Sequence, residues 1–132
     1  MSCFWEGIIK TLNENEKSKL SLANGASKIE LVKCLKRKSY HLTDANVLWQ
    51  GEKLKKQLCN ELKMWVDNYN EQNINNGHDT SSCDPFLVLL CELLDWNITF
   101  MYTGSKISFE NGNSGKKRLV KFGANTHHFF KM

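Results

Sequence analysis

Cys3 stands at a position where a cysteine side chain can become a nucleophile. It directly precedes an amphipathic stretch in which Phe4, Ile8 and Leu12 recur every four residues, and this spacing predicts a helix that begins at about residue 3. The free N–H groups and the positive end of the helix dipole at such a start favour the thiolate form of cysteine. The alternative is a small buried thiol, which is the commoner fate of a cysteine considered alone.

A candidate general base lies at the other end of the chain, in the segment Asn-Thr-His-His-Phe-Phe (residues 125–130). A histidine that begins a strand beside apolar residues can act as a base held by packing, and a structural histidine with satisfied hydrogen bonds is the alternative. A cysteine that begins the first helix and a histidine that begins a late strand together match the layout of papain-like cysteine proteases.

The composition limits the classes of protein that the chain can belong to. Its 132 residues, with 41% hydrophobic and 24% charged, are those of one globular domain spanning 1–132, and they exclude wholesale disorder and fibres. No apolar run is long enough to cross a membrane, and the start of the chain does not match a signal peptide. The net charge of +4 is modest, and a basic cluster at residues 33–38 is expected to be a solvated helix face rather than a nucleic-acid patch.

The five cysteines show no repeated short spacing, and their odd number favours reduced thiols in a cytoplasmic compartment. The nearest approach to a zinc pattern is His78, Cys83 and Cys91, whose gaps of five and eight residues are too long for paired ligands. We therefore expect no metal and no cofactor. Cys34, Cys59 and Cys91 fall in helical stripes and are expected to fill the core.

The first part of the chain is predicted to be helical. The first helix is expected to fray in the polar run 13–19, and a second begins after Ser27, because Ser27 and Glu30 have the spacing of a capping box. A third and longest helix follows. The apolar faces are predicted from residues at helical spacing: Ile29, Val32 and Leu35 in the second helix, and Leu54, Leu58, Leu62, Trp65, Val66 and Tyr69 in the third. The four tryptophans are expected to pack in the core.

A polar loop is predicted over residues 70–82, and the pattern then changes twice. Asp84 is an expected N-cap and Pro85 an expected first residue of a central apolar helix that ends at Leu94. After Leu94 the apolar period becomes two, which predicts four strands near residues 97–102, 107–109, 119–122 and 128–130. Helices followed by an antiparallel meander define an α+β fold, with N-terminal helices packed on a C-terminal antiparallel sheet.

Three segments carry a resemblance to the ovarian-tumour-type (OTU) cysteine proteases. The segment Ser-Cys-Phe-Trp-Glu-Gly-Ile (residues 2–8) looks like the nucleophile segment, whose pattern is Asp-Gly-x-Cys followed by an aromatic or leucine pair and a helix. Residues 83–102 are similar to the buried helix of the family, which leads directly into a strand. Residues 125–129 resemble its last motif, a histidine followed by an aromatic residue. The three segments occur in the family's order over nearly the whole chain.

The resemblance implies a papain-like, OTU-like fold and a monomeric deubiquitinating thiol protease. Its substrates would be conjugates of ubiquitin or a ubiquitin-like modifier, with no nucleic-acid or membrane partner. Cys3 would be the nucleophile and His128 the general base, because an aromatic residue directly follows His128; His127 is the fallback.

Two departures from the family pattern leave alternatives open. Many members carry Asp or Asn two residues after the histidine to orient its ring, and here that residue is Phe130. Asn125 and Asn97 are candidate replacements. The Gly position ahead of the nucleophile is occupied by Met1 and the Asp position precedes it, so a backbone donor to the oxyanion, worth about 10²–10³ in rate, is in question. A piece of a longer protein, a shortened enzyme and an inactive relative all fit this start.

The alternative function is a catalytically impaired OTU-like module that binds ubiquitin or another protein. A third hypothesis is a protein that binds nucleic acid through the basic cluster at residues 33–38. Fourteen asparagines in 132 residues indicate an AT-rich genome, and the compact size favours a viral or parasitic source, in which case the expected compartment is the host cytosol.

Overall fold

The computed structural model describes residues 3–74, 80–124 and 129–132. In the first part of the chain the described elements are six helices and helical turns, with one small hairpin between the fourth and the fifth, and a long helix and four strands follow. The helices are α1 (Cys3–Thr11), α2 (Glu14–Lys19), α3 (Lys28–Arg37), η1 (Ser39–Asp44), α4 (Lys56–Asn68), η2 (Glu71–Asn73) and α5 (Thr80–Leu94). The strands are β1 (Val47–Trp49), β2 (Glu52–Lys53), β3 (Trp96–Tyr102), β4 (Ser105–Asn111), β5 (Arg118–Ala124) and β6 (Phe129–Lys131).

Capping boxes fix the starts of two helices. Ser27 accepts a hydrogen bond from the Glu30 N–H at the start of α3, and the Glu30 carboxylate accepts one from the Ser27 N–H, so the predicted start is confirmed. Asn13 and Glu16 form the same reciprocal pair. The expectation that the chain frays over 13–19 is therefore wrong. The capping box stabilises the start of α2, a short helix made of polar residues.

The inward faces of α3 and α4 are mostly those predicted, with two exceptions. Val32 and Leu35 are fully buried, but Ile29 is 40% exposed and Leu31 takes its place in the core. In α4, Trp65 is 59% exposed. It lies at the edge of the apolar stripe, where a large ring can cover the helix flank without entering the core. The prediction that Trp65 packs in the core is wrong.

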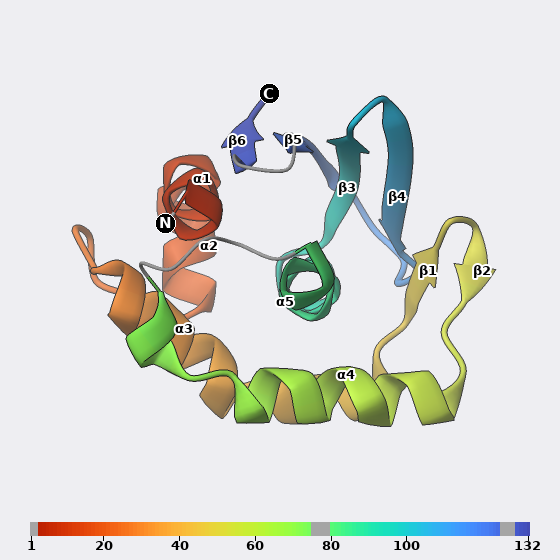
Figure 1. Cartoon of the computed structure of the whole chain (residues 1–132), viewed down its shortest axis with the longest axis horizontal. Helices are drawn as coiled ribbons and strands as arrows, with labels where there is room; N and C mark the ends of the chain where they lie inside the picture. The colour runs from red at the N-terminus through yellow and green to blue at the C-terminus, as the bar shows by residue number, and fades with distance from the viewer. Residues whose placement is uncertain (1–2, 75–79, 125–128) are drawn as a thin grey trace.

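Helix α5 runs through the middle of the protein, beside the sheet and above α4 (Figure 1). All six residues from 86 to 91 are at most 2% exposed, which confirms the predicted central helix. Its start differs from the expectation, because α5 begins at Thr80 and Pro85 lies inside it. With 15 residues α5 is also longer than α4, which has 13. The N-cap role expected for Asp84 is thus not observed.

The sheet is mixed, in the order β2-β1-β4-β3-β5-β6. Strands β3 and β4 form the predicted antiparallel hairpin, but β5 pairs with β3 in parallel, from Trp96 opposite Arg118 to Tyr102 opposite Ala124. The predicted antiparallel meander is wrong because β1 already occupies the outer edge of β4. The chain after β4 crosses the end of β3 and adds β5 on its other side.

The hairpin of β1 and β2 has no counterpart among the predicted elements. Its strands have only three and two residues, and Gln50 and Gly51 join them with φ angles of 54° and 81°. Two successive positive φ angles are typical of the turns that match the twist of a hairpin. Strands this short carry too few alternating residues to be recognised from hydrophobic period alone.

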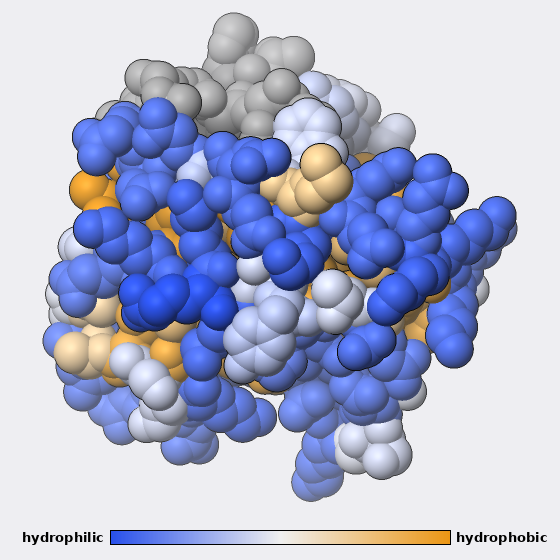
Figure 2. Space-filling view, turned by 90° about the horizontal axis from the view of Figure 1, so that it is seen from below, coloured by the Kyte–Doolittle hydropathy of each residue, from blue (hydrophilic) through white to orange (hydrophobic). Residues whose placement is uncertain are grey.

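The helices gather on one side of the sheet, so that α1 lies next to β6 and α5 next to β3 and β4 (Figure 1). Alternate residues of β3, namely Trp96, Ile98 and Phe100, are buried, which places the core between this side of the sheet and the helices. The face of the protein seen from below in Figure 1 is mostly hydrophilic, with apolar side chains only in small groups (Figure 2). Among the described residues, that face offers no extended apolar patch.

Candidate functional site

Cys3 is the first residue of α1, so the helix start predicted from the sequence is confirmed for the backbone. Its side chain lies outside the part that the structure describes. The first turn of a nine-residue helix presents backbone N–H groups that have no partner within the helix. The backbone of α1 thus begins at the residue to which the sequence analysis assigned the nucleophile.

The last strand lies against this first helix. α1 and β6 are in contact and adjacent in Figure 1, although they come from opposite ends of the chain. β6 begins at Phe129, the residue that follows His128 in the sequence. The predicted site residues His127, His128 and Asn125 lie outside the described residues.

The strand register defines two ends of the sheet. At one end, Phe129 of β6 pairs with Ala124 of β5, which pairs with Tyr102 of β3; we call this the Tyr102 end. At the other end, which we call the Trp96 end, Trp96 pairs with Arg118. A residue that orients the side chain of a residue directly before β6 must therefore lie at the Tyr102 end of the sheet.

Asn97 does not meet this condition. It lies on β3 next to Trp96, five residues from Tyr102, which at about 3.3 Å per residue is a distance of about 16 Å along the strand. Its Oδ1 atom accepts a hydrogen bond of 2.9 Å from the Asn111 N–H. The hypothesis that Asn97 orients the histidine ring is therefore wrong, because the sheet register places it at the opposite end.

An aromatic cluster fixes the position of α1. The Trp5 indole N–H donates to the Tyr69 hydroxyl at 3.1 Å, and the rings of Trp5 and Phe86 pack edge to face with centroids 4.8 Å apart. Tyr69 and Phe86 pack in the same way at 5.2 Å. The cluster joins α1 to the C-cap residue of α4 and to α5, and such aromatic pairs add about 0.5–1.5 kcal/mol each beyond their burial. The start of α1 is thus held in a defined position.

The cysteines whose side chains the structure describes are unsuited to nucleophilic chemistry. Burial raises the pKa of Cys34 and of Cys59, although basic neighbours oppose the shift, and it raises the pKa of Cys91 to about 12. Cys91 Sγ donates to the Trp96 carbonyl at 3.0 Å and Cys34 Sγ to the Leu20 carbonyl at 3.0 Å. All three are core thiols, as predicted.

Asp84 is a polar residue whose environment could not be predicted from the sequence. Its Oδ1 atom is buried and has no hydrogen-bond partner among the described residues. Burial raises its pKa to about 6, from 3.8, because desolvation disfavours the carboxylate. It lies in the first part of α5, two residues before Phe86.

We expect Asp84→Asn to stabilise the protein at neutral pH. Because the pKa is higher in the folded state than in the unfolded state, the stability associated with Asp84 is fully present below about pH 4 and is lost as pH rises to about 6. Removing the charge should raise the free energy of unfolding by about 1–2 kcal/mol at pH 7.5, after allowance for partial exposure. At pH 4 the difference in the free energy of unfolding should shrink to a few tenths of a kcal/mol.

Urea unfolding of both proteins at pH 4 and pH 7.5 measures this difference. A variant that is less stable than the wild type at pH 7.5 would mean that the carboxylate has a stabilising partner, and would contradict the account of Asp84. Glu14→Gln, in an exposed position on α2, serves as a control for the loss of one negative charge.

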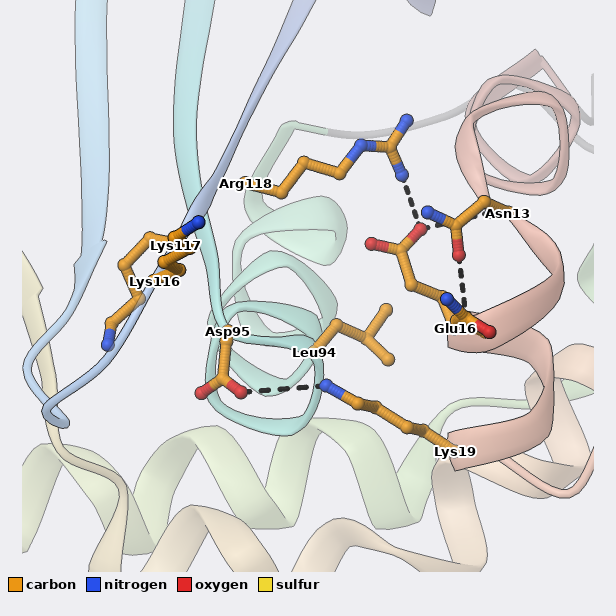
Figure 3. Close-up of a pocket in the computed structure, with 9 residues that line it drawn as sticks. Asn13, Glu16, Lys19, Leu94, Asp95, Lys116, Lys117 and Arg118 are labelled. Carbon is orange, nitrogen blue, oxygen red and sulfur yellow. Dashed lines mark hydrogen bonds and ion pairs between the residues drawn. The ribbon is translucent and has the colours of Figure 1, made fainter.

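A second polar cluster lies at the Trp96 end (Figure 3). Glu16 is 5% exposed, and its carboxylate accepts hydrogen bonds from the Trp96 indole N–H at 2.5 Å and from the Arg118 guanidinium. Arg118 also donates to the Thr11 carbonyl at 3.0 Å and lies over the Trp96 ring, 6.0 Å from its centroid. The cluster connects α2 to β3 and β5 and satisfies a buried charge.

Within residues 3–74, 80–124 and 129–132, no three side chains of the His, Cys, Asp and Glu types come close enough to hold a metal ion. Of the residues proposed above as the nearest zinc pattern, His78 lies outside this part, as does the side chain of Cys83. Among the helices of the described chain, none combines the length and the apolar character needed to cross a bilayer.

No family model matches the chain, and neither a curated protein nor a solved structure does so. The architecture is α+β, with N-terminal helices and a mixed C-terminal sheet.

Proposed function

We propose that the chain is an OTU-like thiol protease of papain-like layout, which hydrolyses the bond after the C-terminus of ubiquitin or a ubiquitin-like modifier. Cys3 is the nucleophile and His128 the general base, with His127 as the fallback. The observation that carries the proposal is the contact of α1 with β6, because it pairs the helix that begins at Cys3 with the strand that directly follows His128 in the sequence.

Two further observations support this assignment. The aromatic cluster of Trp5, Tyr69 and Phe86 holds α1 in place, and a nucleophile has to be fixed to within a fraction of an ångström to react efficiently. Cys34, Cys59 and Cys91 are buried with raised pKa values, so none of these three competes for the role.

The proposed reaction proceeds in two steps. The Cys3 thiolate attacks the carbonyl carbon at the modifier's C-terminus, and the amine leaves with a proton from the His128 imidazolium, which forms a thioester. Water, deprotonated by the now neutral imidazole, then attacks the thioester carbonyl and releases the carboxylate and the thiol. Asn125 is the remaining candidate for orienting the ring, since the register excludes Asn97.

The natural substrates in this proposal are modifier conjugates in the cytoplasm, of a host if the source is a virus, and the protein acts as a monomer. The test is hydrolysis of ubiquitin, and separately of ubiquitin-like modifiers, that carry a fluorogenic amide at the C-terminus. We expect turnover of at least one of them, and alkylation of thiols should abolish it.

A second candidate function is a ubiquitin-binding module without catalysis. The observation that favours it is Phe130, whose ring cannot accept the hydrogen bond that an Asp or Asn would accept at this position. Ubiquitin that binds the folded protein without being cleaved, with an affinity unchanged by Cys3→Ala, would support this function and contradict the protease.

A further inference from the structure

The polar cluster at the Trp96 end borders a pocket with a volume of about 280 Å³ (Figure 3). Three segments that are distant in the sequence line it: α2, the turn between α5 and β3, and the start of β5 with the residues just before it. The charged residues of its wall are Glu16, Lys19, Asp95, Lys116, Lys117 and Arg118. The pocket therefore combines four basic and two acidic side chains.

The two carboxylates are each neutralised by a basic partner. Glu16 is paired with Arg118, and Asp95 lies 3.6 Å from the Lys19 ammonium group. The Asp95 carboxylate also accepts from the Asn111 amide at 3.4 Å. Both acidic groups are thus already engaged by the protein.

Two lysines remain in excess. Lys116 and Lys117 have no carboxylate partner within the described part of the chain, and the Lys117 ammonium group donates only to the Gly115 carbonyl, at 3.1 Å. Both lie in the connection that precedes β5, one exposed and one half-buried. Their flexible side chains can turn toward a ligand, and the pocket carries an uncompensated charge of about +2.

The guanidinium of Arg118 provides a rigid element in this wall. Its Nη1 donates to Glu16 and to the Thr11 carbonyl, which fixes the plane of the group over the Trp96 ring. A guanidinium has five N–H donors in a fixed fork. The donors on Nε and Nη2 have no partner among the described residues and remain for a ligand or water.

We propose that this pocket binds a compact dianion, namely the phosphate group of a small phosphate monoester. A phosphate monoester carries a charge between −1.5 and −2 at neutral pH and presents three acceptor oxygens, which matches the two lysines in excess and the remaining donors of Arg118. A single carboxylate would leave one lysine unpaired. The pocket is also larger than a phosphate group alone, which leaves room for the organic part of an ester.

This site is separate from the proposed catalytic centre. Arg118 begins β5 and Ala124, the neighbour of Phe129, ends it, so about 20 Å of strand lie between them. The phosphate site does not depend on protease activity, and either proposal can fail without the other.

The test measures the unfolding temperature of the protein with and without a phosphate ligand at constant ionic strength, pH 7.5. Inorganic phosphate and glycerol 3-phosphate are the two probes, and sodium chloride sets the baseline. With a dissociation constant on the order of 1 mM, either probe at ten times that concentration should raise the unfolding temperature by about 3–6 °C. The ester should act at a lower concentration than inorganic phosphate, because it fills more of the pocket.

The double variant Lys116→Gln/Lys117→Gln should lose most of this shift. The matched control is Lys53→Gln/Lys106→Gln, which removes the same charge from exposed lysines of β2 and β4 outside the pocket. This control should retain the shift in unfolding temperature. Equal shifts in the two double variants, or no shift in the wild type at 50 mM of either probe (about fifty times the expected constant), would overturn the proposal. A shift with inorganic phosphate but none with the ester would show a phosphate-ion site and contradict the monoester.

Discussion

Replacing His128 with alanine should lower kcat for a ubiquitin C-terminal amide by about 10³–10⁴-fold, with little change in KM. A general base and acid that acts on the reacting atoms contributes about 10²–10⁴ to the rate, and it also maintains the thiolate of the nucleophile. Because a general base acts on the reacting atoms and not on the rest of the substrate, the binding of ubiquitin should be unaffected. Steady-state kinetics over a range of substrate concentrations separate the two constants.

His127→Ala is the matched control, since it removes the same side chain from the neighbouring residue. The proposed mechanism needs only one imidazole as the base, and it assigns that role to His128. We expect His127→Ala to retain activity within about tenfold of the wild type. The reverse result would transfer the role of base to His127, and full activity in both variants would contradict a Cys-His mechanism.

Replacing Glu16 with alanine should lower the free energy of unfolding by about 2–4 kcal/mol. The change leaves the indole N–H of Trp96, a fully buried residue, without an acceptor, and it removes the ionic partner of Arg118. It also opens the capping box with Asn13. The cost stays below that of a fully buried ion pair because the Arg118 side chain is 38% exposed and can reach water.

Urea unfolding followed by tryptophan fluorescence measures this loss, and Glu14→Ala gives the control. Glu14 lies in the first turn of the same helix but is exposed, so its removal should cost no more than about 0.5 kcal/mol. Equal effects of the two substitutions would mean that the cluster at the Trp96 end does not stabilise the connection between α2 and the sheet.

Local signals in the sequence were sufficient to predict several of the helices. The spacing of Ser27 and Glu30 fixed the start of α3, and the apolar run after Pro85 predicted the central position of α5. Asn13 and Glu16 have the same spacing as Ser27 and Glu30. Apolar periodicity does not reveal this helix because the run between Asn13 and Lys19 is polar, whereas a capping box needs no apolar residues.

The sheet order depends on interactions between segments that are distant in the chain. Strand β5 pairs in parallel with β3, while β1, which has only three residues, occupies the other edge of β4. Hydrophobic period predicts that a strand exists and which residues face inward, but it does not select the partner of that strand. For the same reason the sequence alone does not show that Asn97 lies at the Trp96 end, which only the register reveals.

The candidate site could be predicted in part. The start of α1 at Cys3 followed from the four-residue spacing of its apolar residues, and the contact of α1 with β6 agrees with the layout from which the site was inferred. The buried Asp84 Oδ1, which has no hydrogen-bond partner among the described residues, and the Glu16 cluster could not be predicted, because burial of a polar group depends on packing from several elements at once.

The most direct measurement is covalent labelling by ubiquitin that carries an electrophile in place of its C-terminal carboxyl group. After incubation with the purified protein, mass spectrometry of proteolytic fragments identifies the modified residue. The proposed function predicts one adduct, on Cys3, and no adduct with Cys3→Ala or when all cysteines are alkylated first. Labelling of another cysteine, or no labelling by ubiquitin and its relatives in a protein shown by circular dichroism to be folded, would contradict it.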